Sequence, residues 1–203
     1  MHLVDQFEDV TATIVKAKVL CTPADKNGEG TTDANTHLRG YTFKQVPLHA
    51  RRTVTTVNQF GTLSLTTTKP DLLFVPTAKD LVTPPSPPDL NTINVNHYKC
   101  YKVKVTSGTP KFPKGIQALV TDQFTSPQKR FDVRKPKHLC NPVDKNSEGV
   151  KNEDAHLVCY QTKPAKGQPK HVRRTVFVNN QFSPETVTTL KESELCVPSV
   201  KTP

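Results

Sequence analysis

The amino-acid sequence predicts an all-β protein made of two tandem antiparallel units, joined by a Pro-rich linker. Each unit is expected to be a β-sandwich or barrel-like structure built from two half-repeats. Three observations lead to this fold class. A twelve-residue stretch occurs twice, at 49–60 and 171–182, with eight identical positions and an offset of 122. Short segments alternate between polar and apolar residues, as half-buried strands do. The 18 Pro, with abundant Thr and Val, favour strands and turns over helices.

Each half-repeat consists of three sequence themes in a fixed order. An opening segment begins with His and carries Tyr at its end, at residues 37–41, 97–101 and 156–160. A middle segment ends in Gln-Phe preceded by Asp or Asn, at residues 5–7, 58–60, 122–124 and 180–182. A closing segment ends with Pro, at Pro23, Pro76, Pro142 and Pro198. The chain therefore contains four related half-repeats.

In chain order, the half-repeats cover 1–23, 37–79, 97–143 and 156–201, and the first lacks an opening segment. In residues 101–106, Tyr and Val alternate with Lys and Thr, which indicates a strand with one wet face. The predicted organisation is a first unit at 1–80, a linker at 81–96 and a complete second unit at 97–203.

The predicted linker contains the densest run of proline in the chain. Four of the five residues from Pro84 to Pro88 are Pro, a composition typical of stiff, extended polyproline II segments. We expect this linker to hold the two units apart.

The net charge of +10 is concentrated in the second unit. Residues 97–203 contain 19 Lys and Arg against 9 Asp and Glu, whereas residues 1–80 contain 9 against 8. A basic surface on the second unit could bind an acidic glycan or envelope polymer, or its charge could simply solubilise a secreted protein. Nucleic acid is not favoured, because basic and aromatic residues do not interleave. The candidate polyanion-binding side chains belong to the repeated His-x-Arg-Arg stretch and are Arg51, Arg52, Arg173 and Arg174. The alternative, which we favour, is that these side chains line the wet face of a strand.

The five cysteines indicate a disulfide framework. The second unit contains Cys100, Cys140, Cys159 and Cys196. In the first unit the counterparts of the last two are Gly40 and Phe74, so these two cysteines are lost together, as expected of partners. We therefore expect the disulfides Cys100–Cys140 and Cys159–Cys196, each closing a loop of about 40 residues and adding on the order of 3–4 kcal/mol. A zinc site is not favoured, because no Cys-x-x-Cys pair is present.

Cys21 is left as an unpaired or intermolecular thiol. The offset of 119 between Cys21 and Cys140 places the expected counterpart of Cys100 about 19 residues ahead of Met1. We therefore expect either a piece of a longer repeat array or a strand supplied by another molecule. Disulfides persist in oxidising compartments, so the expected location is extracellular or at the cell surface. No apolar stretch approaches the roughly 18 residues of a membrane span.

Two related loops are candidate calcium sites. They cover 25–30 and 144–149 and place oxygen-bearing side chains at alternate positions before a Gly. The candidate ligands are Asp25, Asn27, Glu29, Asp144, Asn146 and Glu148. The twelfth loop position, which holds a Glu in EF-hands, is Thr36 or Ala155 here. The alternative is a polar turn, since Asp, Asn and Gly favour turns for local reasons.

No catalytic motif is visible in the sequence. It has no Gly-x-Ser-x-Gly, no His-Glu-x-x-His and no phosphate-binding loop. The three opening His residues occupy equivalent positions, which favours a structural role. We therefore do not expect an enzyme.

The motifs His-x-x-Cys-Tyr-x-x-Lys, Asn-Gln-Phe and Leu-Cys-Val-Pro-x-x-Lys are clearest in 156–163, 180–182 and 195–201. This signature resembles secreted bacterial repeat proteins of uncharacterised function. We expect an extracellular structural repeat protein that self-associates into a surface layer or filament through strand complementation between identical subunits. The alternative is a binding module for an acidic glycan or envelope polyanion, using the basic second unit.

Overall fold

The computed structural model describes residues 1–202, and within this range it contains strands and no helix. The prediction of an all-β antiparallel fold is confirmed. The thirteen strands are β1 (His2–Asp5), β2 (Asp9–Cys21), β3 (Ala24–Lys26), β4 (His37–Val46), β5 (Thr53–Asn58), β6 (Gly61–Asp80), β7 (Tyr98–Val105), β8 (Gln117–Asp122), β9 (Thr125–Lys145), β10 (His156–Pro164), β11 (Thr175–Asn179), β12 (Glu185–Thr188) and β13 (Glu194–Thr202). In the described range, no helix is long and apolar enough to span a membrane.

Alternating side chains explain why these segments form strands. In β11, Val176 and Val178 are buried while Thr175 is exposed. In β8, Ala118 and Val120 are buried and lie on the same face. A period of two places these apolar side chains on one side of the sheet, where they leave water together.

Three long strands each serve two parts of the fold. The first half of β2, β6 and β9 forms a hairpin with β1, β5 and β8, respectively. The second half continues into a central sheet. In β6 the register shifts between Thr67 and Lys69 and again between Pro70 and Leu72. Bulges of this kind bend and twist a strand, so one strand can run first in the hairpin and then, in a different direction, in the central sheet.

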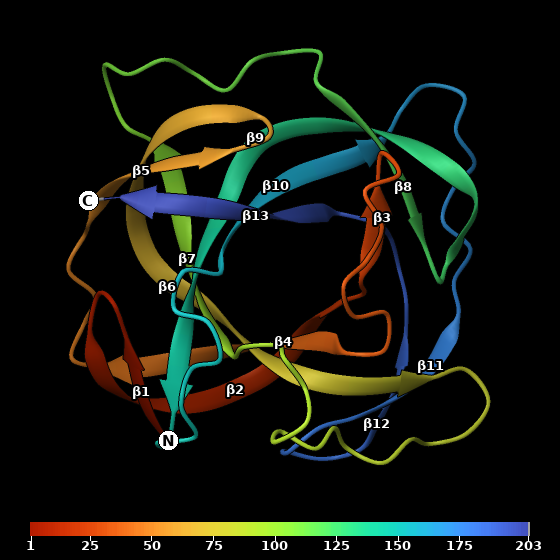
Figure 1. The fold of residues 1–203 in the computed structure, drawn as a ribbon, viewed down its shortest axis with the longest axis horizontal. Coiled ribbons are helices and arrows are strands. Elements are labelled where there is room, and N and C mark those ends of the chain that lie inside the picture. Colours follow the sequence, from red (N-terminus) through yellow and green to blue (C-terminus); the bar gives the residue numbers. More distant parts are fainter. Residues whose placement is uncertain (203) are drawn as a thin grey trace.

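The central sheet alternates closing and opening strands in the order β2-β4-β6-β7-β9-β10-β13. All of these pairings are antiparallel. The strands wrap around a common centre, with β9, β10 and β13 opposite β2 and β4 (Figure 1). β2 and β13 are the two ends of this order.

The expected division into separate units at 1–80 and 97–203 is not confirmed. Strands of the two ranges pair in five places, namely β1–β9, β3–β8, β5–β13, β6–β7 and β6–β11. Residues 81–96 contain no strand, and Asn179 donates to the carbonyl oxygen of Pro85 at 2.9 Å. Sequence repetition identifies equivalent strands, but it does not reveal which edges pair.

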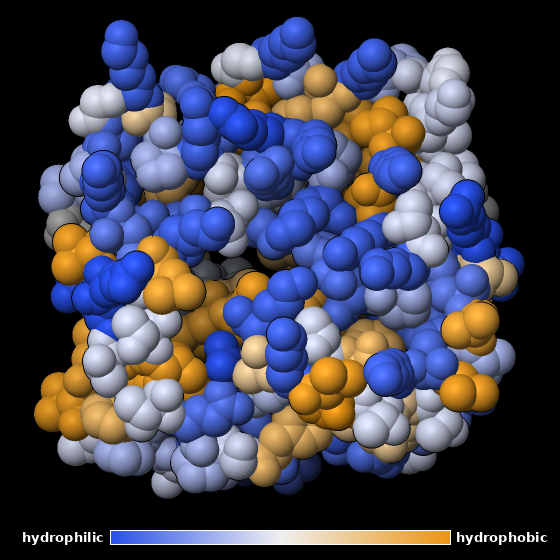
Figure 2. All heavy atoms as spheres, turned by 180° about the vertical axis from the view of Figure 1, so that it is seen from behind, coloured by the Kyte–Doolittle hydropathy of each residue, from blue (hydrophilic) through white to orange (hydrophobic). Residues whose placement is uncertain are grey.

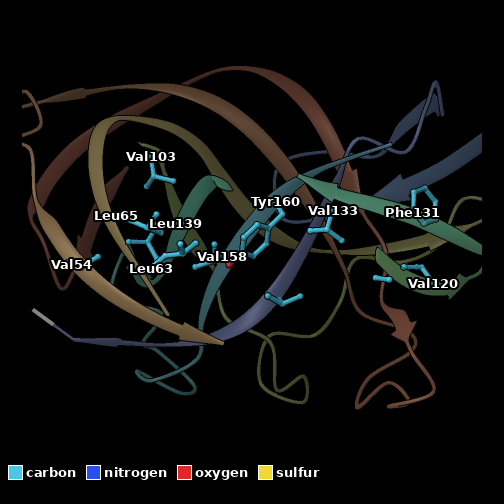
Figure 3. Packing of buried hydrophobic residues seen from close by; sticks show 12 residues of the cluster. Val54, Leu63, Leu65, Val103, Val120, Phe131, Val133, Leu139, Val158 and Tyr160 are labelled. Atoms are coloured by element: carbon cyan, nitrogen blue, oxygen red, sulfur yellow. The ribbon is translucent and has the colours of Figure 1, made fainter. Parts of the chain in front are cut away.

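Three hydrophobic clusters form the core. The largest joins strands β5 to β10 with β13 and extends from Val54 to Phe131, with Tyr160 between these ends (Figure 3). A second cluster includes Leu3, Tyr41 and Val143. The third lies on the other face of the central sheet and contains the cystines. Hydrophilic residues dominate the face shown in Figure 2, interrupted by separate hydrophobic patches.

Candidate functional site: the open seam between β2 and β13

The central sheet has two open edges, which we call the β2–β13 seam. Residues 13–21 of β2 pair with β4 alone, and residues 194–199 of β13 pair with β10 alone. Each strand between them, from β4 to β10, has a neighbour on both edges. Unpaired edge groups are templates for another strand, so this is the part of the described chain with the clearest binding geometry.

The two edges enclose one interior. Cys21 of β2 and Cys196 of β13 both pack against the cluster that contains Cys140. Beside it, a polar chain crosses from one edge to the other. Lys18 lies 3.5 Å from Asp71, and this carboxylate lies 3.0 Å from His138, which also contacts a carboxylate of β13. The seam is therefore a gap between strands that share one core.

Exposure of equivalent residues marks the seam on both faces of the sheet. Cys100, Cys140 and Cys159 are fully buried, whereas Cys21 and Cys196 are only partly buried. On the opposite face, the closing-strand leucines behave in the same way. Leu73 and Leu139 are fully buried, and Leu20 and Leu195 are partly buried. The same sequence position is thus less buried only in the two edge strands, because each of these lacks one neighbour.

The disulfides have the pairing expected from the sequence. Cys100 is bonded to Cys140, and Cys159 to Cys196, at directly opposed positions of an opening and a closing strand. The pair Gly40 and Phe74 occupies the same register between β4 and β6. Within residues 1–202, Cys21 is the one free cysteine. It lies on β2, at the position that forms a disulfide in β9 and β13.

The environment of Cys21 lowers the reactivity of its thiol. Burial raises the pKa of its thiol to about 12, and the nearby charge of Glu194 acts in the same direction. The thiolate is the nucleophilic form of cysteine, so the thiol form that dominates near neutral pH is poorly reactive.

His138 bridges two acidic side chains in the interior. Its Nδ1 lies 2.8 Å from Glu194 Oε2, and its Nε2 lies 3.0 Å from Asp71 Oδ2. Burial alone would lower the pKa of His138, but hydrogen bonds and charge from both carboxylates outweigh it and raise the pKa. The two carboxylates therefore favour the protonated form of the ring, which links β6 to β13.

The Tyr residues of the opening strands are held by the Asp or Asn of the Gln-Phe motifs, an interaction that we call the Tyr latch. Three Tyr latches are present: Tyr101 donates to Asp5 at 2.6 Å, Asn58 donates to Tyr160 at 2.9 Å, and Asn180 donates to Tyr41 at 2.8 Å. The Phe of the same motif packs edge-on against the Tyr, with ring centroids 5.3, 5.2 and 5.0 Å apart. Each latch joins two half-repeats that are not neighbours in sequence.

The fourth Gln-Phe motif has other partners. Asp122 accepts a hydrogen bond from the hydroxyl of Thr22 at 3.1 Å, and Lys79 Nζ lies 4.9 Å from the ring centroid of Phe124. None of the Tyr residues in the described range contacts this motif. Asp122 and Phe124 thus form a fourth latch without its Tyr.

Sequence reasoning missed the Tyr latch. The available signal was the Asp or Asn before each Gln-Phe, together with the Tyr at the end of each opening segment. Both are visible in the sequence, but their pairing across distant half-repeats is a property of the fold.

The candidate polyanion-binding arginines lie in two equivalent loops before β5 and β11, and not on the wet face of a strand as expected. Arg51, Arg52, Arg173 and Arg174 are all exposed. None of them forms a salt bridge within residues 1–202, although Arg52 contacts the carbonyl oxygen of Phe7 at 3.4 Å. The structure does not bring acidic partners to these side chains, and their guanidinium groups remain available to solvent.

The His of the same repeated stretch has a structural role. His49 Nε2 lies 2.8 Å from the hydroxyl of Thr67, and His171 Nε2 lies 2.8 Å from that of Thr189. The two Thr hydroxyls also accept the backbone N–H groups of Arg52 and Arg174. This anchor fixes the base of each hairpin and explains why the stretch recurs.

The candidate calcium loops are built as turns. Asp25 Oδ1 accepts the N–H of Gly30 at 3.1 Å, and Asp144 Oδ1 accepts that of Gly149 at 3.0 Å. In both loops the Glu is ion-paired with the Lys three residues earlier, as Glu148 is with Lys145. In the part of the chain that the structure describes, no group of three His, Cys, Asp or Glu residues could hold a metal ion.

The two loop asparagines extend neighbouring strands. Asn27 donates its N–H to the carbonyl of Leu119, and its side-chain oxygen accepts the N–H of the same residue at 2.9 Å. Asn146 makes the same pair of contacts with His2. These contacts account for the recurrence of the Asp-Lys-Asn sequence through strand pairing.

Together, the sheet, cystines and latches define a disulfide-bonded β-repeat protein with one open seam. The chain belongs to the family described as a repeat of unknown function (DUF7450), which matches residues 37–198. No curated protein and no solved structure matches the chain.

Proposed function

We propose that the protein is an extracellular structural repeat protein, a subunit of a cell-surface layer or filament that assembles through β-strand contacts between subunits. The β2–β13 seam carries this proposal. Residues 13–21 and 194–199 leave backbone hydrogen-bonding groups unpaired on strands that also border a partly covered core. A strand from another molecule can satisfy those groups and cover apolar side chains at the same time.

Two features support a structural, extracellular role. The two disulfides favour an oxidising compartment. The buried charged groups are engaged with one another: Lys99, which is fully buried, donates to Glu8 at 2.7 Å, and both ring nitrogens of His138 contact carboxylates. Groups held in this way link strands and support a structural role for these side chains.

Sedimentation velocity over a range of protein and salt concentrations tests the proposal. We expect association that increases with concentration and persists at high salt, because backbone pairing and apolar contacts are weakly screened. Val15→Lys places a charge on the open edge of β2, where Val15 is 54% exposed, and should weaken association.

The matched control is Val172→Lys, in a loop outside the seam, where the Val is 66% exposed. Equal effects of the two variants would show that the added charge, and not the open edge, controls association. A chain that stays monomeric at every concentration would overturn the proposal.

A second candidate function is binding of an acidic polysaccharide. It is favoured by the exposed Arg173 and Arg174, which form no salt bridge in the described range, and by the basic excess of residues 97–203. Affinity for a sulfated polysaccharide should fall steeply with salt concentration. Arg173→Gln with Arg174→Gln should weaken it more than the equally charged control Lys166→Gln with Lys170→Gln. Binding without any self-association would favour this function over assembly.

A further inference from the structure

We propose that the β2–β13 seam binds one β-strand with the opening pattern His-x-x-Cys-Tyr, antiparallel to both edges and supplied by another molecule that carries the repeat. The inference rests on the proposed function and deepens it by naming the strand that the seam accepts. The register of the three opening strands already present supports it, as does the fourth latch.

The opening strands share one register between their closing-strand neighbours. Cys100 of β7 lies opposite Leu72 of β6 on one side and Cys140 of β9 on the other. Cys159 of β10 lies opposite His138 and Cys196. Each opening Cys thus faces a closing Cys on one neighbouring strand. On the other neighbouring strand it faces the residue two positions before the closing Cys or its equivalent, namely His138 before Cys140 and Leu72 before Phe74.

The same register can be applied to the seam. A strand between β13 and β2 would place its Cys opposite Glu194 on β13 and opposite Cys21 on β2. Gly40 confirms that β2 and β6 follow this rule, because it lies opposite Val19 and Phe74. The free thiol of Cys21 is thus at the position where a disulfide forms between the other opening and closing strands.

The fourth latch identifies the next residue of the incoming strand. In the complete latch, Asp5 Oδ2 accepts from Tyr101 and also from Asn141, which directly follows Cys140. Asp122 Oδ2 accepts from Thr22, which directly follows Cys21. Asp122 therefore has one of the two donors that Asp5 has, and a Tyr after the incoming Cys would supply the other and pack against Phe124.

Opening strands already paired within their own sheet are not free to fill a neighbour's seam. β4, β7 and β10 each have closing strands on both edges, so donating one would open a second gap. A second copy of the chain must therefore release one of its own opening strands in order to donate it, whereas an opening strand that is unpaired in its own molecule can bind without this cost.

A covalent step can follow binding. The incoming thiol and the Cys21 thiol each lose one hydrogen as their S–S bond forms, and a small disulfide such as oxidised glutathione is reduced to two thiols. The incoming thiolate first attacks glutathione disulfide and releases one glutathione. The small thiolate fraction of Cys21 then attacks the incoming sulfur and expels the second glutathione, which takes the proton that Cys21 released.

A synthetic peptide with the sequence of residues 97–105, the opening segment with β7, tests the inference on the full chain. We expect saturable binding by fluorescence anisotropy and, with oxidised glutathione, a mixed disulfide that intact mass and peptide mapping place on Cys21. Cys21→Ser should abolish the covalent product and keep binding. A peptide of residues 37–45, in which Gly40 replaces the Cys, should bind without cross-linking.

The latch provides a second, independent readout. Asp122→Ala should weaken peptide binding by about tenfold, the loss expected for one hydrogen bond to a charged group. Asp122→Asn should keep most of the affinity, because Asn58 and Asn180 serve two natural latches. In the peptide, Tyr101→Phe should weaken binding to the parent chain and have little further effect on Asp122→Ala.

Several outcomes would overturn the inference. These are equal binding of a scrambled peptide, cross-linking at Cys196 by exchange, and unchanged affinity in Asp122→Ala. If the chain assembles alone but does not bind the peptide, only this inference fails. If the peptide binds as expected but the chain never self-associates, the inference stands and the proposed assembly of identical subunits fails.

Discussion

Asn180 donates a hydrogen bond from Nδ2 to the hydroxyl of Tyr41 at 2.8 Å, across 139 residues of sequence. Both side chains are almost fully buried, and Asn180 also donates to the hydroxyl of Thr77 at 3.2 Å. The contact holds the turn after β11 against β4 and β6. A buried amide that bonds to two partners in distant strands makes the latch a structural joint between the early and late parts of the chain.

Removing this amide should destabilise the protein measurably. Asn180→Ala leaves the Tyr41 and Thr77 hydroxyls without their shared donor, and we expect a loss of about 1–3 kcal/mol in the free energy of unfolding. Urea denaturation measures it. Gln181→Ala, at the exposed neighbouring position, should stay within about 0.5 kcal/mol of the parent. Equal stability of the two variants would contradict a structural latch.

A third disulfide should form between positions 40 and 74, where the repeat has Gly and Phe in place of the two cysteines. Gly40→Cys with Phe74→Cys places two thiols at the register that Cys159 and Cys196 use. We expect an intact mass lower by two hydrogens than that of the reduced chain. We also expect a midpoint for denaturation that falls on reduction.

The single change Gly40→Ala is the informative control for this pair. A Cβ at Gly40 would lie 2.5 Å from Val19 Cγ2 and 2.7 Å from Phe74 Cε1. Keeping the Phe ring should therefore make Gly40→Ala destabilising by about 1–3 kcal/mol through overpacking. A neutral Gly40→Ala would mean that the ring moves freely and that space at this position is not limiting.

Alkylation of Cys21 should be slow near neutral pH. Because its pKa is raised to about 12, the reactive thiolate should increase about tenfold for each pH unit below that value. Mass spectrometry of iodoacetamide-treated protein measures the rate. Glu194→Gln removes a charge that raises the pKa and should speed the reaction. A rate at pH 7 equal to that of a free peptide thiol would contradict the burial of this sulfur.

His138 should stabilise the protein more at neutral than at alkaline pH. Its pKa is raised in the folded state, so its contribution is fully present below the unfolded value of about 6.5 and is lost as pH rises through the folded pKa. Between about pH 6 and 9, the parent should lose more stability than His138→Asn. Urea denaturation across this range measures the difference, and NMR titration of the ring measures the pKa directly.

The exposed His2 provides the control for this pH dependence. His2→Gln should leave the alkaline loss of stability unchanged, since its side chain is half exposed beside Asp9. Parallel curves for the parent and His138→Asn would show that another group is responsible.

The disulfide pairing could be predicted from the sequence because equivalent positions of the half-repeats can be compared with one another. Gly40 and Phe74 replace the equivalents of Cys159 and Cys196 together, and paired residues tend to be lost as a pair. The all-β fold was equally predictable, since alternation is a local property of short segments. The Tyr latches were not, because their partners lie roughly a hundred or more residues apart and neither residue type is diagnostic alone.

The division into two units was the natural interpretation of a repeat with a Pro-rich linker, and the strand pairing differs from it. Equivalent strands carry nearly equivalent edges, so β6 could have closed a unit of its own as readily as pair with β7. Which edges meet depends on the bends of β6 and β9 and on side-chain packing across the whole sheet. Neither property is encoded within a single half-repeat.

The sequence by itself determined the strands, the four half-repeats, the two cystines and the isolated position of Cys21, because these follow from local alternation and internal comparison. Only the tertiary structure decided that β2 and β13 border one interior and that Asp122 stands where Asp5 holds a Tyr. The physical reason is that backbone hydrogen bonds and burial are satisfied between strands. Whether an edge stays open therefore depends on which strands become neighbours, and these strands lie far apart in the sequence.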